Sequence, residues 1–394
     1  MPKNYHIEIN CQQINCEGER ICGDVFLHKR VKEENRIVAV LSDGMGHGVK
    51  ANVLATLTAT MAANFTAEHR DFGKIAEIIM STLPVCSERG TSYSTFTIVD
   101  IEEVEKVSVL EYDNPEAFII RNQKLLEPGW QKISLNSDEN AGKILRNCSF
   151  IPEKEDRIVF CSDGVTQSGL GSKEFSQGWR RSELVSFVQA EIRKNPFISA
   201  EDLSERVVKK AFQNDNLTPK DDISCAVIYF REPRKMLICT GPPYDENKDS
   251  EYAEKARQFE GLKVLCGATT GDIVSREWGT QIVDSADFVD SDLPPVSQME
   301  GVDLITEGIL TLTKVSNILK DYGPQTVPGK GPADQIVKML LQSDQIDFLV
   351  GTRINIAHQD PTLPVELEIR RTVVKRIAAL LEEKFLKEVR IEFI

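Results

Sequence analysis

Aspartates stand at the ends of three short apolar segments of this chain. The tripeptide Ser-Asp-Gly follows an apolar run at residues 42–44 and again at 162–164, and the pair Asp221 and Asp222 directly precedes the apolar run 223–228. If these runs are β-strands, their ends can meet at one rim, where gathered carboxylates repel one another unless cations lie between them. Oxygen ligands without a nearby His or Cys cluster favour Mg²⁺ or Mn²⁺. The sequence therefore predicts a divalent metal site.

Aspartate and glycine also mark strand ends simply as turn residues. This explanation is sufficient for any one of the positions, but it is weaker for all of them jointly. After Asp43 a glycine-rich turn, 44–48, leads into a helical pattern with Lys50 in its first turn. The N–H groups of such a helix start would suit a phosphate group.

Length and composition predict a soluble protein of two domains. At 394 residues the chain exceeds the roughly 250–300 residues at which single hydrophobic cores stop growing. A formal net charge of −14 argues against nucleic-acid binding. The sequence shows no export signal and no membrane-spanning stretch, so we expect a cytoplasmic protein without a membrane partner.

The nine cysteines indicate a reducing compartment. Their number is odd, they form no C-x-x-C pair, and several lie in apolar, strand-like runs. The spacing of Cys11, Cys16 and Cys22 fits no common zinc pattern, which favours buried strand positions over a metal or redox cluster. We therefore expect reduced thiols.

Residues 1–231 begin and end with strand patterns and contain two pairs of helical patterns, with further strand patterns between the pairs. The runs within 93–121 are interpreted as a meander of neighbouring strands. We predict strands over 5–14, 21–27, 36–41, 93–101, 104–112, 118–121, 157–161 and 223–230, and helices over 49–65, 72–83, 182–192 and 200–212.

After a short hinge at 231–234, strands and helices alternate, which predicts a second, Rossmann-like α/β domain over 235–394. The glycine-containing turn 267–271 precedes a helix and could receive an anion, with Arg276 or Arg353 supplying positive charge. Tight strand-to-helix turns explain the same glycines equally well. We predict strands over 236–239, 262–266, 302–305, 346–350 and 389–393, and helices over 250–259, 270–278, 307–319, 333–341 and 364–385.

The aspartate blocks taken together resemble those of the metal-dependent protein phosphatase (PPM) superfamily, specifically its bacterial stage II sporulation protein E-like branch. The resemblance covers residues 1 to about 231, and its blocks occur in the family's order: Gly23-Asp24, Ser42-Asp43-Gly44-Met45-Gly46-His47-Gly48, Ser162-Asp163-Gly164-Val165 and Asp221-Asp222-Ile223-Ser224. It implies a PPM-type β-sandwich flanked by helices, in an α/β (α+β) chain whose second domain is the Rossmann-like one.

The resemblance also implies a role for each matching residue. Asp43 would bridge two Mn²⁺ or Mg²⁺ ions. The carbonyl oxygen of Gly44 would bind the second ion, and Asp163 and Asp221 would hold the first. Asp43 and Asp163 would thus be the central catalytic groups, because a metal-activated water is the nucleophile in this family.

Residues beside these positions have weaker assignments. Asp24 matches an acidic position that lies beside the metal pair and binds or orients its water ligands, while Asp222 would be a neighbour or an auxiliary ligand. Met45 replaces a histidine that often serves as general acid in eukaryotic members, so protonation of the leaving group has no assigned residue. For His47 as an acid and Arg20 as a phosphate ligand, an exposed surface position is at least as good an explanation.

The function implied is hydrolysis of phosphoserine or phosphothreonine in proteins of a bacterial signalling pathway. Residues 235–394 would regulate this phosphatase or bind a ligand. Two alternatives stay open: a catalytically weak regulatory binding protein that responds to metal or nucleotide, and a small-molecule phosphohydrolase. The expected partner is a phosphorylated protein substrate, and a small ligand on the second domain and a homodimer are left open.

Overall fold

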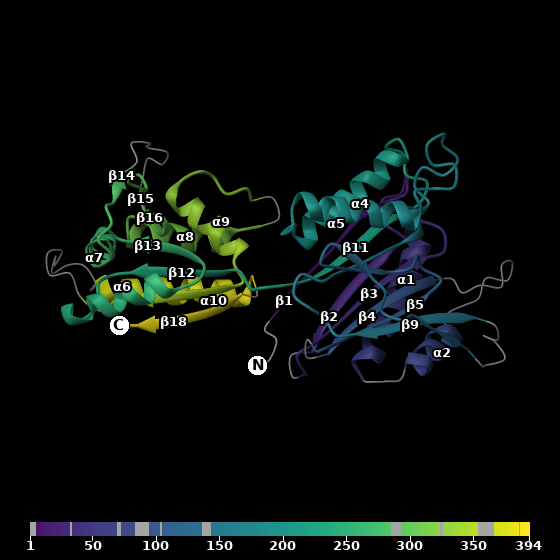
Figure 1. Ribbon diagram of the computed structural model, residues 1–394, viewed down its shortest axis with the longest axis horizontal. Coiled ribbons are helices and arrows are strands. Elements are labelled where there is room, and N and C mark those ends of the chain that lie inside the picture. Colours follow the sequence, from purple (N-terminus) through teal and green to yellow (C-terminus); the bar gives the residue numbers. More distant parts are fainter. Residues whose placement is uncertain are drawn as a thin grey trace. The chain divides into compact units, whose positions relative to one another are not determined.

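The computed structural model forms two compact units, Met1–Glu232 (unit 1) and Pro233–Ile394 (unit 2) (Figure 1). Each unit has hydrophobic clusters of its own. The structure describes residues 5–31, 34–68, 72–82, 94–102, 105–135, 143–284, 293–323, 326–353, 366–385 and 387–394.

Unit 1 is built round two antiparallel sheets. The six-stranded sheet has the order β2-β3-β4-β5-β9-β8, and the five-stranded sheet has the order β1-β11-β10-β6-β7. The strands are β1 His6–Ile14, β2 Val25–Val31, β3 Arg36–Gly44, β4 Ser94–Glu102, β5 Lys106–Tyr112, β6 Phe118–Arg121, β7 Lys124–Leu126, β8 Gln131–Ser134, β9 Ile144–Phe150, β10 Arg157–Cys161 and β11 Ile223–Arg231.

The two sheets pack face to face, and helices cover their outer faces (Figure 1). Leu41, Phe160 and Ile228 belong to the buried cluster that joins the sheets. Helices α1 and α2 pack on the six-stranded sheet, and α4 and α5 pack on the five-stranded sheet. This confirms the predicted β-sandwich flanked by helices. The helices are α1 Gly48–Ala67, α2 Phe72–Thr82, α3 Asp163–Thr166, α4 Arg180–Lys194 and α5 Ala200–Asn214.

The predicted meander is wrong in its third strand. Strands β4 and β5 are neighbours, but β6 pairs with β10 and β7 in the other sheet. The chain changes sheets after β5, where the Glu111 carboxylate accepts a hydrogen bond from the N–H of Ala117 at 2.6 Å. Strand β9, in a segment for which no strand was predicted, takes the place beside β5.

Unit 2 contains a seven-stranded sheet in the order β14-β15-β16-β13-β12-β17-β18. The five strands from β16 to β18 in this order are parallel, and β14 and β15 add an antiparallel edge. Numbered along the chain, the parallel strands lie in the order 3-2-1-4-5, which is the doubly wound, Rossmann-like arrangement. The strands are β12 Lys235–Thr240, β13 Leu262–Cys266, β14 Val283–Asp284, β15 Ser297–Met299, β16 Val302–Thr306, β17 Gln345–Val350 and β18 Glu388–Phe393.

Helices cover both faces of this sheet, as expected when each parallel connection crosses over it. Helices α8, α9 and α10 share one buried cluster with the sheet, and α6 and α7 share another. The helices are η2 Glu246–Lys248, α6 Asp249–Gln258, α7 Ala268–Trp278, α8 Ile309–Asp321, α9 Pro332–Gln342 and α10 Glu366–Glu383.

Two further properties concern the whole described chain. No helix within the described ranges is long and apolar enough to cross a membrane. The eight cysteines that the structure describes are all free, and six of them are buried. Cys86 lies outside the described residues.

Candidate metal centre

Strand pairing in the two sheets of unit 1 brings the predicted aspartates to one rim. In the six-stranded sheet the register of β2 against β3 puts Asp24, just before β2, beside Asp43 near the end of β3. In the five-stranded sheet β10 runs antiparallel to β11, so Asp163, just after β10, lies near Asp221, just before β11. The packing of the sheets then joins the two pairs.

The negative charges of the other three aspartates destabilise the ionised form of Asp43. Burial raises the pKa of Asp43 well above its ordinary value, and the negative charges of Asp24, Asp163 and Asp221 raise it further. Three nearby negative charges strongly destabilise the ionised form of a buried carboxyl group. Asp43 therefore lies at the electrostatic centre of the rim.

The three neighbouring carboxylates show the same effect. Burial, followed by neighbouring carboxylates, raises the pKa of Asp24 to about 7 and the pKa of Asp221 to about 6. Burial is also the main cause that raises the pKa of Asp163. A cation placed among these groups would lower every one of these pKa values, because it favours the charged forms.

The donor atoms at this rim are oxygens, which suit Mg²⁺ or Mn²⁺. Within the described ranges, no three carboxylate, imidazole or thiolate side chains lie close enough together to hold an ion on their own. An ion here would therefore take part of its coordination from a backbone carbonyl, such as that of Gly44, and from water. Mg²⁺ in proteins commonly keeps several waters, so the residues fit such an ion.

Both glycines of the repeated Ser-Asp-Gly tripeptide are required by close backbone contacts. A Cβ atom on Gly44 would overlap the carbonyl of Ala51, where α1 passes over the end of β3. A Cβ atom on Gly164 would overlap the carbonyl of Asp222 in the same way. The glycines therefore let the neighbouring segments approach the two aspartates closely.

Two residues for which the sequence predicted no role, Ser224 and Gln13, hold Asp24. The hydroxyl of Ser224 donates to Oδ2 of Asp24 at 2.6 Å, and Nε2 of Gln13 donates to Ser224 Oγ at 2.9 Å. Strands β1 and β11 of one sheet thus fix a carboxylate of the other sheet. Ser224 lies in the block that begins at Asp221, whereas Gln13 has no signal in the sequence.

A further missed contact concerns Asp163. Nε2 of Gln167 donates to Oδ2 of Asp163 at 2.8 Å. Gln167 stands four residues after Asp163, directly after the short helix α3 that Asp163 begins. This spacing places the two side chains on one side of the turn, which is the only sequence signal that pointed to the contact.

Asp222 has a different role from its neighbour Asp221. Its buried carboxylate accepts hydrogen bonds from the backbone N–H groups of Cys16 and Gly23, both at 2.9 Å. These two amides belong to the connection that leads from β1 in one sheet to β2 in the other. We therefore assign Asp222 to positioning this crossover rather than to binding an ion.

The loop before α1 does not offer the phosphate position that its glycines suggest. Nδ1 of the exposed His47 lies 2.7 Å from Oε1 of Glu19, and the Glu19 carboxylate also lies against Gly48. The start of α1 therefore already faces a negative charge of the protein itself. Arg20 and Lys50 are exposed to solvent.

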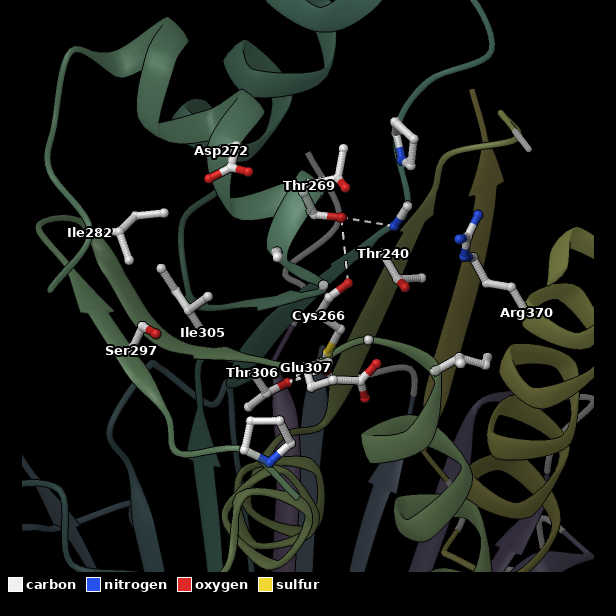
Figure 2. Close-up of a pocket in the computed structure, with 18 of the residues that line it drawn as sticks. Thr240, Cys266, Thr269, Asp272, Ile282, Ser297, Ile305, Thr306, Glu307 and Arg370 are labelled. Atoms are coloured by element: carbon white, nitrogen blue, oxygen red, sulfur yellow. Dashed lines mark hydrogen bonds between the residues drawn. The ribbon is translucent and has the colours of Figure 1, made fainter. Parts of the chain in front are cut away.

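A separate cavity of about 700 Å³ lies in unit 2 at the carboxyl ends of parallel strands (Figure 2). The predicted glycine turn lines it, but neither predicted arginine does. Arg276 pairs with Asp249 at 2.6 Å, and Arg353 pairs with Glu246 at 2.5 Å. Arg370 of α10 lines the cavity instead.

Comparison with known proteins identifies the family to which the unit 1 sequence is similar. Residues 33–231 match the family model "Stage II sporulation protein E (SpoIIE)", which confirms the resemblance. The chain is 32% identical over 66 residues to the phosphoserine phosphatase RsbX of Bacillus subtilis (strain 168), a match that covers 17% of this chain and about a third, 32%, of that relative.

Solved structures give weaker similarity. The phosphatase domain of Bacillus subtilis SpoIIE with a fragment of its regulatory domain has 16% identity and a TM-score of 0.46, over 58% of this chain and 64% of that chain. RsbX in complex with magnesium has 17% identity and a TM-score of 0.40, over 58% and 97% of the two chains. These TM-scores are too low to support a functional argument.

Proposed function

The chain belongs to the stage II sporulation protein E (SpoIIE) family, and on that premise we propose that unit 1 is a metal-dependent protein phosphatase. It removes phosphate from phosphoserine or phosphothreonine of a protein substrate in a bacterial signalling pathway of the cytoplasm. The observation that carries this proposal is the strand register that puts Asp24 beside Asp43 and Asp163 near Asp221, where the charges of the other three raise the pKa of Asp43. Such a cluster is costly without cations and is therefore expected to serve a metal-dependent reaction.

The residues of the rim divide into ligands and supports. Asp43, Asp163, Asp221 and the carbonyl oxygen of Gly44 would hold two Mg²⁺ or Mn²⁺ ions. Bound ions of this kind lower the pKa of water and neutralise charge on phosphate oxygens. Asp24, fixed by Ser224, would orient water at the edge of this set.

Protonation of the leaving oxygen is a separate question. His47 is engaged with Glu19 and is exposed, and Met45 cannot donate a proton. We therefore assign no side chain of the loop 44–48 as general acid, and the alkoxide of serine or threonine would take its proton from water.

Unit 2 would regulate or target the phosphatase. Its Rossmann-like sheet carries a cavity at the strand ends, where parallel α/β domains bind ligands. This supports a ligand-binding role for residues 235–394, in addition to the chemistry of unit 1.

The test is hydrolysis of p-nitrophenyl phosphate and of a phosphoserine peptide by the full chain with Mn²⁺, with EDTA, and with Mn²⁺ restored. We expect activity only with the metal, and loss of activity in Asp163→Ala. The control is Asp202→Asn, an exposed carboxylate at the start of α5, which should keep full activity. Metal-independent turnover, or an active Asp163→Ala variant, would refute the proposal. Turnover of small phosphomonoesters alone would favour a small-molecule phosphohydrolase.

A further inference from the structure

The cavity of unit 2 lies at the carboxyl ends of three neighbouring parallel strands, the side of such a sheet where ligands bind. The ends of β12, β13 and β16 contribute Thr240, Cys266 and Thr306 to its lining. The turns that follow β13 and β16 meet at Gly267 and Gly308, since a Cβ on Gly308 would lie 3.4 Å from the Cα of Gly267. The cavity volume of about 700 Å³ is within the range of roughly 300–1,000 Å³ typical of small-molecule sites.

Two helices begin at this cavity, but only one of them has an open start. The N–H of Thr311 in α8 donates to the Glu307 carboxylate at 3.1 Å, so this helix start already has an anionic partner. Helix α7 begins after Gly267 and has no side-chain cap, and Ala268 and Thr269 are exposed at its start. The first N–H groups of α7 can therefore receive an anion.

A buried hydroxyl gives independent support for a ligand at this end. Thr240 is only 1% exposed and lines the cavity. Within the described part of the chain its hydroxyl makes no hydrogen bond, whereas the neighbouring Thr270 hydroxyl accepts from Gly241 N at 2.9 Å and donates to Cys266 O at 3.4 Å. A polar group bound in the cavity would give this hydroxyl a hydrogen-bond partner.

Arg370 supplies the positive charge that the anion requires. It reaches from α10 to the rim of the cavity, and Nη1 donates to the carbonyl of Gly351 at 3.3 Å. Figure 2 shows Arg370 on one side of the cavity, with Thr240 and Thr269 between it and the opposite wall.

The opposite wall is apolar and carries carboxylates at its edge. Ile282 and Ile305 lie there together with Ser297 (Figure 2). Asp272 and Asp284 also line the cavity, and both are exposed. Apolar side chains suit the face of a flat ring, and carboxylates suit hydroxyl groups, which can donate to them.

We infer that this cavity binds a nucleoside phosphate. Its phosphate would lie at the start of α7, on the side of the cavity that Arg370 lines, and would accept a hydrogen bond from Thr240. Its ribose hydroxyls would donate to carboxylates at the cavity edge, and its base would pack on Ile282 and Ile305. This function is independent of phosphatase catalysis in unit 1.

The test is isothermal titration calorimetry of the full chain with ADP, GDP, CDP and UDP, in EDTA so that the aspartate rim of unit 1 holds no ion. At least one diphosphate should bind, and its nucleoside should bind at least about tenfold more weakly. We expect a loss of about tenfold for Thr240→Val and about a hundredfold for Arg370→Gln. Inorganic phosphate alone should compete only weakly.

The controls are Arg371→Gln, on the same helix and stacked on Phe393, and Thr58→Val, a buried threonine of α1. Both should bind like the wild type. Hydrogen exchange with the bound diphosphate should show protection at 268–270, a readout that does not depend on the variants. Absence of binding by all four diphosphates, equal binding of nucleoside and diphosphate, or protection confined to unit 1 would overturn the inference.

Discussion

The rim of unit 1 gathers the carboxylates Asp24, Asp43, Asp163 and Asp221, whereas the cavity of unit 2 presents a helix start, a buried hydroxyl and an arginine. In the rim of unit 1, burial and mutual repulsion raise the pKa of the aspartates, and a cation would relieve this repulsion. The cavity of unit 2 offers hydrogen-bond donors, and the proposed anion would accept from them. The two sites thus differ because strand ends supply carboxylates in unit 1, whereas a helix start and an arginine of α10 supply donors in unit 2.

Topology explains how each site is assembled. The five parallel strands of unit 2 all end at the same edge of the sheet, so the turns that follow neighbouring strands lie close together. In the antiparallel sheets of unit 1 neighbouring strands end at opposite edges, so the rim combines the end of β3 and β10 with the start of β2 and β11. Such a site needs extra supports, and Asp222 and Ser224 provide them.

The sharpest test of the cation-requiring site is Asp43→Asn. We expect phosphatase activity to fall about a thousandfold, because several kcal/mol of metal-dependent stabilisation are lost. In EDTA the same variant should melt at a higher temperature than the wild type, because one repelling charge is gone. Full Mn²⁺-dependent turnover in Asp43→Asn would show that the rim is not the metal centre.

Glycine-to-alanine substitutions compare how closely backbone segments pack at the rim of unit 1 and at the cavity of unit 2. Gly44→Ala should destabilise the protein by about 3 kcal/mol, because its methyl group overlaps the Ala51 carbonyl. Gly46→Ala has open space but a φ of +88°, and should cost about 1 kcal/mol. In unit 2, Gly308→Ala makes only an ordinary contact with Gly267 and should cost less than either. Urea unfolding measures all three, and equal losses would contradict the distinction.

Substitution of the adjacent Asp221 and Asp222 tests whether one binds metal and the other supports the backbone. Asp222→Asn should lower the free energy of unfolding by about 2 kcal/mol, since its amide group cannot accept from both Cys16 and Gly23. Asp221→Asn should leave stability in EDTA unchanged or higher and should weaken Mn²⁺-dependent activity. Thermal melts with parallel assays measure both effects. The reverse pattern would exchange the two roles.

The last test is the pH dependence of stability without metal. The folded pKa values of about 7 for Asp24 and about 6 for Asp221 lie above the unfolded value near 3.9. The folded state therefore binds more protons between roughly pH 4 and 7, and the free energy of unfolding should fall as the pH rises through this window. Each proton contributes at most about 1.4 kcal/mol per pH unit. Denaturation in EDTA should show this slope, and Mn²⁺ should flatten it.

Most elements of the fold followed from local patterns. Apolar runs such as 36–41 and 223–230 predicted β3 and β11, and helical spacing predicted α1 and α5. The sheet partner of β6 and the strand β9 were missed, because short or polar strands take their place from pairing rather than from periodicity. The boundaries of α7 and α8 shifted by only a few residues.

The sequence by itself determined which residues could do chemistry in unit 1, because aspartates at strand ends followed by glycine form a local pattern. Only the tertiary structure showed that Asp222 accepts hydrogen bonds from the backbone, in contrast to Asp221, and that Gln13 and Ser224 hold Asp24. In unit 2, only the tertiary structure showed that Arg370 lines the cavity and that Arg276 and Arg353 do not. These contacts link residues far apart in the chain. The packing of sheets and helices decides them, and no local spacing encodes that packing.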